Sequence, residues 1–235
     1  MAVVLLAAYF TQAEAQNNPK KKAAKAGPMA PVTDVEGLPR VLLIGDSISI
    51  GYTLPVRKAL EGKVNVHRPR TNCGPTTKGL QGIDEWLATG GSDKKWDLIH
   101  FNWGLHDLKY MGPNGENLAD PKAADSKQQV PPDEYRKNLQ QLVDRLQETG
   151  ATLIWRNTTP VPEGSKGRAT GHSQQYNEIA REIMEKEKIQ IQDLYSFTMK
   201  DQENLQKKAD VHYTGAGSQA LGEEVATLIL DVLEK

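Results

Sequence analysis

The sequence has little of several features that mark other classes of protein. It holds one cysteine, Cys73, so no disulfide can form within the chain. Its 29 Lys and Arg residues nearly balance 30 Asp and Glu, and a formal net charge of −1 gives no field that attracts nucleic acid or an anionic membrane. No His and Cys cluster has zinc-ligand spacing, and no glycine-rich phosphate loop occurs. We therefore expect no metal, no cofactor and no nucleic-acid partner.

The amino-terminal region is apolar over a short stretch and then polar. The apolar run at residues 2–10 has the length of a signal-peptide core and is too short to span a bilayer. Ala13-Glu14-Ala15 fits a small-x-small cleavage site, although no Lys or Arg precedes the run. Residues 16–37 are rich in Lys, Ala, Pro and Asn without apolar periodicity. These patterns predict a signal peptide (1–15), a flexible basic linker (16–37) and a domain (38–235) of an exported protein, periplasmic or extracellular and not stably inserted in a membrane, with a cytoplasmic protein as the alternative.

After residue 38, short apolar runs alternate with helical patterns. The runs at residues 40–45, 63–68, 97–103, 152–157 and 189–194 are rich in Val, Ile and Leu, which is typical of strands covered on both faces. Helical patterns are expected near residues 52–61, 77–89, 133–149, 173–188 and 215–234. This alternation predicts one α/β domain with three α/β/α layers and a five-stranded parallel sheet. Sites in such sheets lie beyond the carboxyl ends of the strands.

The most informative segment follows the first of these strands, where the run at residues 41–44 ends in Gly45-Asp46-Ser47. A strand–turn–helix of this kind presents the Ser47 hydroxyl near a helix amino terminus, where backbone N–H groups can stabilise a developing oxyanion. It would thus serve the same purpose as the nucleophile elbow of other hydrolases. The structural alternative is that Asp46 and Ser47 cap the helix and do nothing else.

A second segment, just before the last helical pattern, favours the catalytic interpretation. His212 lies there with Asp210 two residues ahead of it. A serine hydroxyl is a poor nucleophile near neutral pH, so it needs an imidazole base, and a carboxylate holds that imidazole in the correct tautomer. Ser47, Asp210 and His212 are therefore the candidate catalytic residues, and a Ser47–His212 dyad held by another acceptor is the alternative.

From about residue 38 onward, the chain resembles the SGNH/GDSL hydrolase family, which is marked by four short blocks. The first block, Gly-Asp-Ser, is intact at residues 45–47, and residues 72–76 look like the second, with Gly74 as its oxyanion-hole glycine. The resemblance implies a flavodoxin-like fold and a metal-independent esterase that forms an acyl-enzyme on its serine. Its oxyanion hole would include the backbone N–H groups of Ser47 and Gly74.

Two blocks depart from the family pattern. The third usually reads Gly-x-Asn-Asp, whereas residues 104–107 place His106 where the family has its oxyanion-binding asparagine. An imidazole N–H can also donate, so we expect His106 to take this role, with Asn102 as the alternate donor. Asp107 should stabilise the loop by accepting backbone N–H bonds. The last block usually reads Asp-x-x-His, but here Ala209 occupies the acid position and Asp210 is one residue closer to His212.

The remaining expectations concern the substrate. The two long loops at residues 109–130 and 158–171 should shape a cleft, and the aromatic side chains of Trp103 and Tyr110 are candidates for stacking on sugars. We expect a small-molecule or glycan ester, with a short acyl group such as acetyl on a carbohydrate. The alternatives are a lipolytic esterase or thioesterase of the same family, and a non-catalytic glycan-binding protein on an esterase scaffold. The sequence does not determine the oligomeric state.

Overall fold

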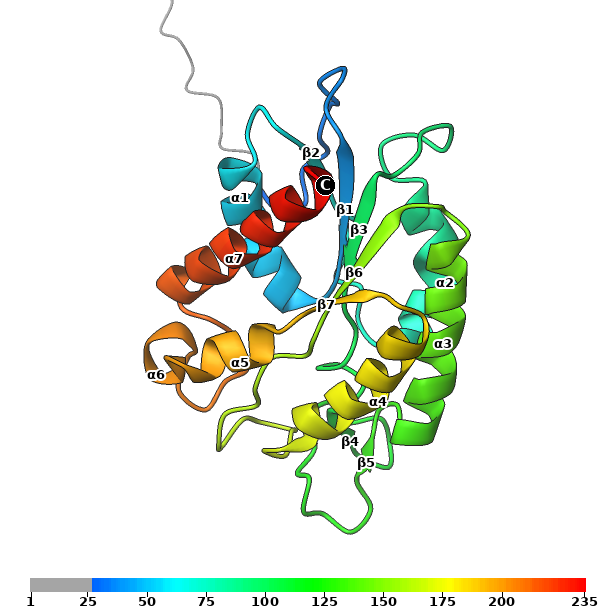
Figure 1. The fold of residues 1–235 in the computed structure, drawn as a ribbon. Helices are drawn as coiled ribbons and strands as arrows, with labels where there is room; N and C mark the ends of the chain where they lie inside the picture. Colours follow the sequence, from blue (N-terminus) through cyan, green and yellow to red (C-terminus); the bar gives the residue numbers. More distant parts are fainter. Residues whose placement is uncertain (1–26) are drawn as a thin grey trace, which may run out of the picture.

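The computed structural model describes residues 27–235, which fold around one five-stranded sheet (Figure 1). All its strand pairs are parallel, and the strand order is β2-β1-β3-β6-β7. The strands are β1 (Arg40–Ile44), β2 (Asn65–His67), β3 (Leu98–Phe101), β6 (Thr152–Arg156) and β7 (Gln190–Gln192). The three central strands are almost wholly buried because their apolar side chains are covered on both faces.

Helices cover both faces of the sheet. On one face, α1 (Ser47–Ala59) packs against α7 (Gly215–Leu233). On the other, α3 (Pro132–Gln147) lies between α2 (Thr76–Leu87) and α4 (His172–Lys186), as Figure 1 shows. The predicted three-layer α/β/α, flavodoxin-like fold is therefore confirmed.

Four short elements were not predicted from the sequence. They are β4 (Tyr110–Met111) and β5 (Lys127–Gln128), which pair antiparallel, and the short helices α5 (Leu194–Met199) and α6 (Gln202–Leu205). Each is too short to produce a detectable hydrophobic period. The first helix also begins earlier than expected, at Ser47 and not at residue 52, because the Asp46 carboxylate accepts the Ile48 N–H at 3.0 Å and caps it.

The segment ahead of β1 corrects one predicted boundary. The predicted signal peptide (1–15) and residues 16–26 of the predicted linker lie outside the described residues. Residues 27–37 do not behave as a free linker, because Asp34 forms ion pairs with Arg40 (3.0 Å) and Lys94 (2.6 Å) and a hydrogen bond with the His67 ring (2.5 Å). The Asn65 side chain also accepts the Val35 backbone N–H at 2.8 Å. The folded domain therefore includes residues that the composition assigned to the linker.

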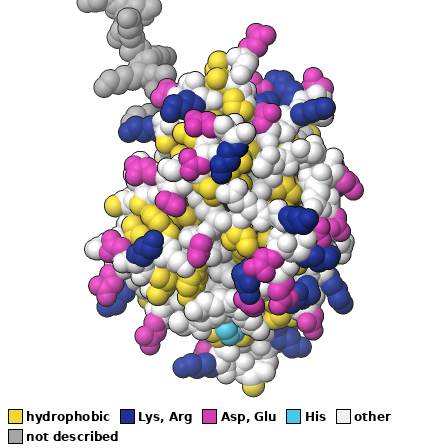
Figure 2. Space-filling view, in the orientation of Figure 1, with side chains coloured by type: hydrophobic (Ala, Val, Ile, Leu, Met, Phe, Trp, Pro, Cys, Tyr) yellow, Lys and Arg dark blue, Asp and Glu magenta, His cyan; other side chains and the backbone are white. Residues whose placement is uncertain are grey.

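The molecular surface carries mixed charge. Figure 2 shows Lys, Arg, Asp and Glu side chains interspersed over one face. Within residues 27–235, no helix has the length and apolar composition to cross a membrane. Cys73 is fully buried and burial raises the pKa of its thiol to about 11, as expected for a structural thiol and not a nucleophile.

Candidate active site

Ser47 stands at the carboxyl end of β1, as the first residue of α1. Asp46, immediately before it, is 3% exposed and accepts from the Ile48 N–H and from the fully buried Arg156 guanidinium at 3.3 Å. These bonds hold the strand-to-helix turn and leave the Ser47 side chain half-buried. The first N–H groups of a helix have no partner within it; Asp46 binds that of Ile48, and the Ser47 N–H has no acceptor within residues 27–235.

The fold brings Ser47 and His212, 165 positions apart, into hydrogen-bond contact. Ser47 Oγ lies 2.9 Å from His212 Nε2. The other ring nitrogen, Nδ1, lies 2.7 Å from Asp210 Oδ1, and the same oxygen accepts the backbone N–H of His212 at 3.0 Å. One carboxylate oxygen thus contacts both the backbone and the ring of the same histidine. This geometry accounts for how the shortened Asp–His spacing still orients the imidazole.

The loop that carries His212 is anchored on both sides. The Lys207 N–H donates to the His212 carbonyl at 2.9 Å, and Gln206, 4% exposed, donates its amide to the carbonyls of Pro160 and Val211. Ala209, just before Asp210, has φ +51, a left-handed conformation that costs a non-glycine residue free energy. The packed loop holds this turn, which points the next side chain at the imidazole.

The Asp210–His212 pair is open to solvent. Their side chains are 41% and 46% exposed. Partial burial acts to raise the pKa of the Asp210 carboxyl, but the hydrogen bonds from the backbone and ring of His212 outweigh it, so the pKa is lowered. An ionised Asp210 facing Nδ1 leaves Nε2 as the proton acceptor for Ser47. The arrangement can therefore activate a serine hydroxyl at an accessible surface.

The second-block loop contacts the turn before Ser47, but its expected oxyanion donor, the Gly74 N–H, is already hydrogen-bonded within the loop. The Cys73 N–H donates to the Gly45 carbonyl at 3.2 Å, which places this loop beside the nucleophile turn. Gly74 has φ +61, a conformation that favours glycine, and its N–H donates to the side-chain Oδ1 of Asn72 at 2.9 Å. Gly74 is thus near the expected position, but its N–H becomes available to an oxyanion only when the Asn72 side chain moves.

His106 is half-buried, and the charges of Asp46 and of several cations act on its ring. Burial lowers the pKa of its ring to about 4; the Asp46 carboxylate opposes this, and the charges of Lys109, Arg168 and Lys78 add to it. His106 is therefore a neutral imidazole near pH 7, with one N–H and one acceptor nitrogen. Its ring forms no hydrogen bond with any residue of the described chain. The ring N–H is available to a ligand.

Two predicted site residues belong instead to the core. Asn102 is 1% exposed and donates its amide to the Arg156 carbonyl at 2.8 Å and to the Thr158 hydroxyl at 3.2 Å, so it has no N–H left for an oxyanion. Trp103 is 1% exposed and stacks on Trp86, with ring centroids 6.5 Å apart, so it cannot stack on a sugar. Both predictions were wrong because these residues follow β3 directly: consecutive side chains point to opposite faces, and helices cover both faces of the sheet, so both side chains are buried.

Two other predicted residues lie on β4 and in the third-block loop. Tyr110 is half-buried on β4, with its ring 5.8 Å from that of His172, and it lines an open cavity. Asp107 is fully buried, and its Oδ1 accepts the N–H and hydroxyl of Thr76 at 2.8 and 2.5 Å, so the expected loop-stabilising role is confirmed. Burial raises the pKa of Asp107 to about 7, against the Thr76 hydrogen bonds.

One positioning residue, Arg68, gave no signal in the sequence. Arg68 is 2% exposed, and its guanidinium donates to the Gly45 carbonyl at 3.3 Å and the Thr71 carbonyl at 3.2 Å. It therefore ties the nucleophile turn to the second-block loop. A single arginine after a strand indicates a surface residue in most proteins, so only the structure assigns Arg68 this place.

Comparison with known proteins agrees with this geometry. Residues 43–220 match the model of the GDSL-like Lipase/Acylhydrolase family. No curated protein sequence matches the chain. Three similar solved structures have between 13% and 18% identity and show a common fold. The first is an acetyl xylan esterase, with a TM-score of 0.60 and 13% identity over 81% of this chain and 99% of that one. The second is an acetylxylan esterase from Geobacillus stearothermophilus, with a TM-score of 0.63 and 18% identity over 81% of this chain and 94% of that one. The third is the lipase/acylhydrolase from Enterococcus faecalis, with a TM-score of 0.62 and 17% identity over 82% of this chain and 95% of that one.

The family match spans more than half of the chain and includes the Ser47 turn, the third-block loop and the His212 loop. Its limits enclose the three segments that the fold brings to one edge of the sheet. The protein is therefore an ester hydrolase by family, and this chain belongs to the GDSL-like lipase/acylhydrolase family.

Proposed function

We propose that the protein is a metal-independent serine esterase that forms an acyl-enzyme on Ser47. The observation that carries the proposal is the continuous chain of contacts from Ser47 Oγ to His212 Nε2 (2.9 Å) and from His212 Nδ1 to Asp210 Oδ1 (2.7 Å). These three side chains supply the nucleophile, the base and the group that stabilises the charged base. The mechanism needs no metal to activate the nucleophile.

In this mechanism, His212 removes the Ser47 proton as Oγ attacks the acyl carbonyl, and Asp210 stabilises the imidazolium. The negative charge of the tetrahedral intermediate develops beside the Ser47 N–H at the start of α1. His106 donates its free ring N–H to the same oxygen, and Gly74 adds its backbone N–H once Asn72 releases it. His212 then returns the proton to the departing alcohol, and water attacks the acyl-enzyme by the reverse route.

We propose short acyl groups, acetyl above all, on a carbohydrate as the substrate class. The half-exposed Asp210–His212 pair supports this, because an accessible site admits a bulky polymer. Two of the similar structures are named as acetylxylan esterases, although fold similarity at this identity selects no substrate. A series of p-nitrophenyl esters from acetyl to decanoyl tests the acyl preference, and we expect kcat/KM to fall sharply with chain length. A rise with chain length would favour a lipolytic esterase or thioesterase.

The catalytic proposal is tested by the substitution Ser47→Ala. We expect turnover of p-nitrophenyl acetate to fall by at least about 10⁴-fold, while the circular dichroism spectrum and Tm stay unchanged. Ser196→Ala, at an exposed serine on α5, is the matched control and should keep full activity. A fluorophosphonate probe should label the wild type and not Ser47→Ala. Absence of labelling in the wild type would instead support a non-catalytic glycan-binding protein.

A further inference from the structure

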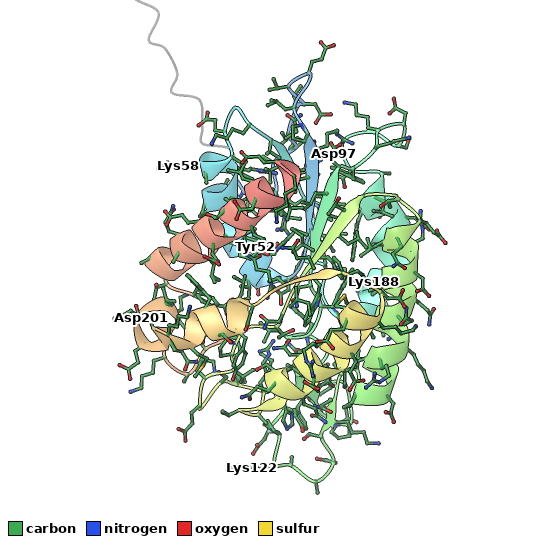
Figure 3. All side chains as sticks on the ribbon, viewed as in Figure 1. Tyr52, Lys58, Asp97, Lys122, Lys188 and Asp201 are labelled. Carbon is green, nitrogen blue, oxygen red and sulfur yellow. The ribbon has the colours of Figure 1, made fainter. Side chains whose placement is uncertain are left out.

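A cavity of about 800 Å³ lies between the two long loops. One loop follows β3 and the other follows β6, so both leave the sheet at its carboxyl edge. The side chains that concern its chemistry are Tyr110, Leu118, Lys122, Lys166, Arg168 and His172. Figure 3 labels Lys122 on the loop that extends furthest from the sheet at this end of the molecule. No step of the mechanism above uses this cavity.

The cavity is formed by direct contact between the loops. The Tyr110 N–H donates to the Gly167 carbonyl at 2.8 Å, which joins the two loops backbone to backbone. Gly167 has φ +66, and a Cβ placed there would lie 2.3 Å from the Leu118 Cα, so a larger residue would force the loops apart. The cavity walls are therefore held in place before any ligand binds, which lowers the entropic cost of binding.

Both walls of the cavity contact residues that neighbour the proposed catalytic groups in the chain. Arg168 Nε donates to the Leu105 carbonyl at 2.9 Å, and Leu105 precedes His106. On the other side, a Cβ placed at Gly164 would lie 3.2 Å from the Cβ of Ala209, the residue before Asp210. A glycan whose ester reaches Ser47 would extend its neighbouring sugars into this space.

The charge of the cavity favours an anion. Its lining holds three cations, Lys122, Lys166 and Arg168, and two carboxylates, Asp120 and Glu163. Asp120 accepts the backbone N–H of Lys122 at 2.9 Å and so caps its own turn. Among residues 27–235, none of these five side chains forms an ion pair. The cavity therefore presents more positive charge than its own carboxylates neutralise.

Arg168 is the cation placed to bind a ligand. It is half-buried, and its Nε bond to the Leu105 carbonyl fixes the plane of the guanidinium. Its two terminal nitrogens find no acceptor in the described part of the chain, although a half-buried guanidinium is stabilised when its N–H groups are satisfied. Two terminal N–H groups held side by side match the two oxygens of a carboxylate.

On the basis of the esterase function proposed above, we propose that this cavity binds the carbohydrate part of the substrate and that the carbohydrate carries a carboxylate, as in a uronic acid. Arg168 binds that carboxylate through its terminal nitrogens. The Tyr110 ring packs on the face of the adjoining sugar, and Lys122 and Lys166 add a favourable field without fixed contacts. The preferred substrates are thus O-acetylated acidic glycans.

The test uses one matched pair of substrates. An O-acetylated oligogalacturonide is compared with the same oligosaccharide after reduction of its carboxylates to primary alcohols, and kcat/KM is measured for both. We expect the wild type to prefer the acidic substrate. Arg168→Gln should lower this preference roughly 10- to 100-fold, mainly through KM, because hydrogen bonds to a charged group are lost. Arg168→Lys keeps the charge and should restore part of the preference.

The control variant is Arg181→Gln, an exposed arginine on α4 whose partners are Glu178 and Glu185 on the same helix, and it should leave both rates unchanged. Equal wild-type rates on the two substrates would overturn the proposal. An equal loss on both substrates in Arg168→Gln would also overturn it, since Arg168 would then act only by holding Leu105. If Ser47-dependent cleavage of p-nitrophenyl acetate is intact, either result is still consistent with the esterase function. Loss of that cleavage in the wild type would instead contradict the esterase function.

Discussion

The two halves of the candidate active site differ in how completely the isolated chain assembles them. On the nucleophile side, Ser47, His212 and Asp210 already form a chain of contacts of 2.9 and 2.7 Å. On the oxyanion side, the Gly74 N–H is bound to Asn72, and the family's asparagine is replaced by the neutral ring of His106. The nucleophile side is ready for reaction without a ligand, whereas the oxyanion side needs one side chain to move.

This difference indicates how each side of the site accommodates its departure from the family pattern. The shortened acid–base spacing is accommodated locally, since Asp210 contacts its histidine through a two-residue turn. The oxyanion side depends on three separate segments, and its backbone donor can be captured by a nearby acceptor such as Asn72. We therefore expect substitutions on the first side to be severe and those on the second to be graded.

The largest effect should follow from Asp210→Asn. The substituted side chain no longer stabilises the imidazolium, and in other serine enzymes this change lowers kcat by about 10⁴. Steady-state kinetics on p-nitrophenyl acetate measure it, with the exposed Asp231→Asn on α7 as the control. A loss of less than tenfold would show that a Ser47–His212 dyad suffices and that the nucleophile side depends less on the carboxylate than its geometry indicates.

A smaller effect is expected from the oxyanion side, where His106→Ala and Asn72→Ala form a matched pair. His106→Ala should lower kcat about 10²-fold with little change in KM, because its N–H is proposed to act in the transition state. Asn72→Ala frees the Gly74 N–H and should leave kcat unchanged or raise it. If Asn72→Ala loses turnover and His106→Ala does not, the Asn72 amide is the side-chain donor.

The last prediction concerns stability and expects no loss of turnover of the size given above. Burial raises the pKa of Asp107 to about 7 from 3.8, so the folded protein holds this proton more tightly than the unfolded chain. The contribution of Asp107 to the free energy of unfolding should therefore be greatest below pH 3.8 and decline as the pH rises towards 7, at up to about 1.4 kcal/mol per pH unit.

Denaturant unfolding of the wild type and Asp107→Asn across this range isolates the effect, because the substituted amide does not ionise. The wild type should lose stability relative to the variant as the pH rises. A difference that stays constant from pH 4 to pH 7 would contradict a buried titrating carboxyl at this position. Turnover of the variant, measured at the same pH values, shows whether the Thr76 contact also positions the second-block loop.

Much of this protein could be predicted from local sequence. The apolar runs identified all five strands of the sheet, and the helical periods identified all five long helices within a few residues. The predicted turn at Ser47 and the pairing of Asp210 with His212 depend on neighbours in sequence and on strand ends that share one edge. The short elements α5, α6, β4 and β5 were missed because a few residues carry no period.

The sequence by itself determined the order of strands and helices along the chain and the nucleophile turn, because these follow from periodicity and from contacts a few residues apart. Its short motifs also identified the residues of the candidate triad. Only the tertiary structure decided that Asn102 and Trp103 are buried, that Asn72 holds the Gly74 N–H, and that Arg168 lines a cavity between the two long loops. The burial of Asn102 and Trp103 and the place of Arg168 depend on which side of a strand or loop meets a distant segment, and the Asn72 contact depends on the conformation that the packed second-block loop adopts. That outcome is set by packing across the whole domain, which a local pattern does not contain.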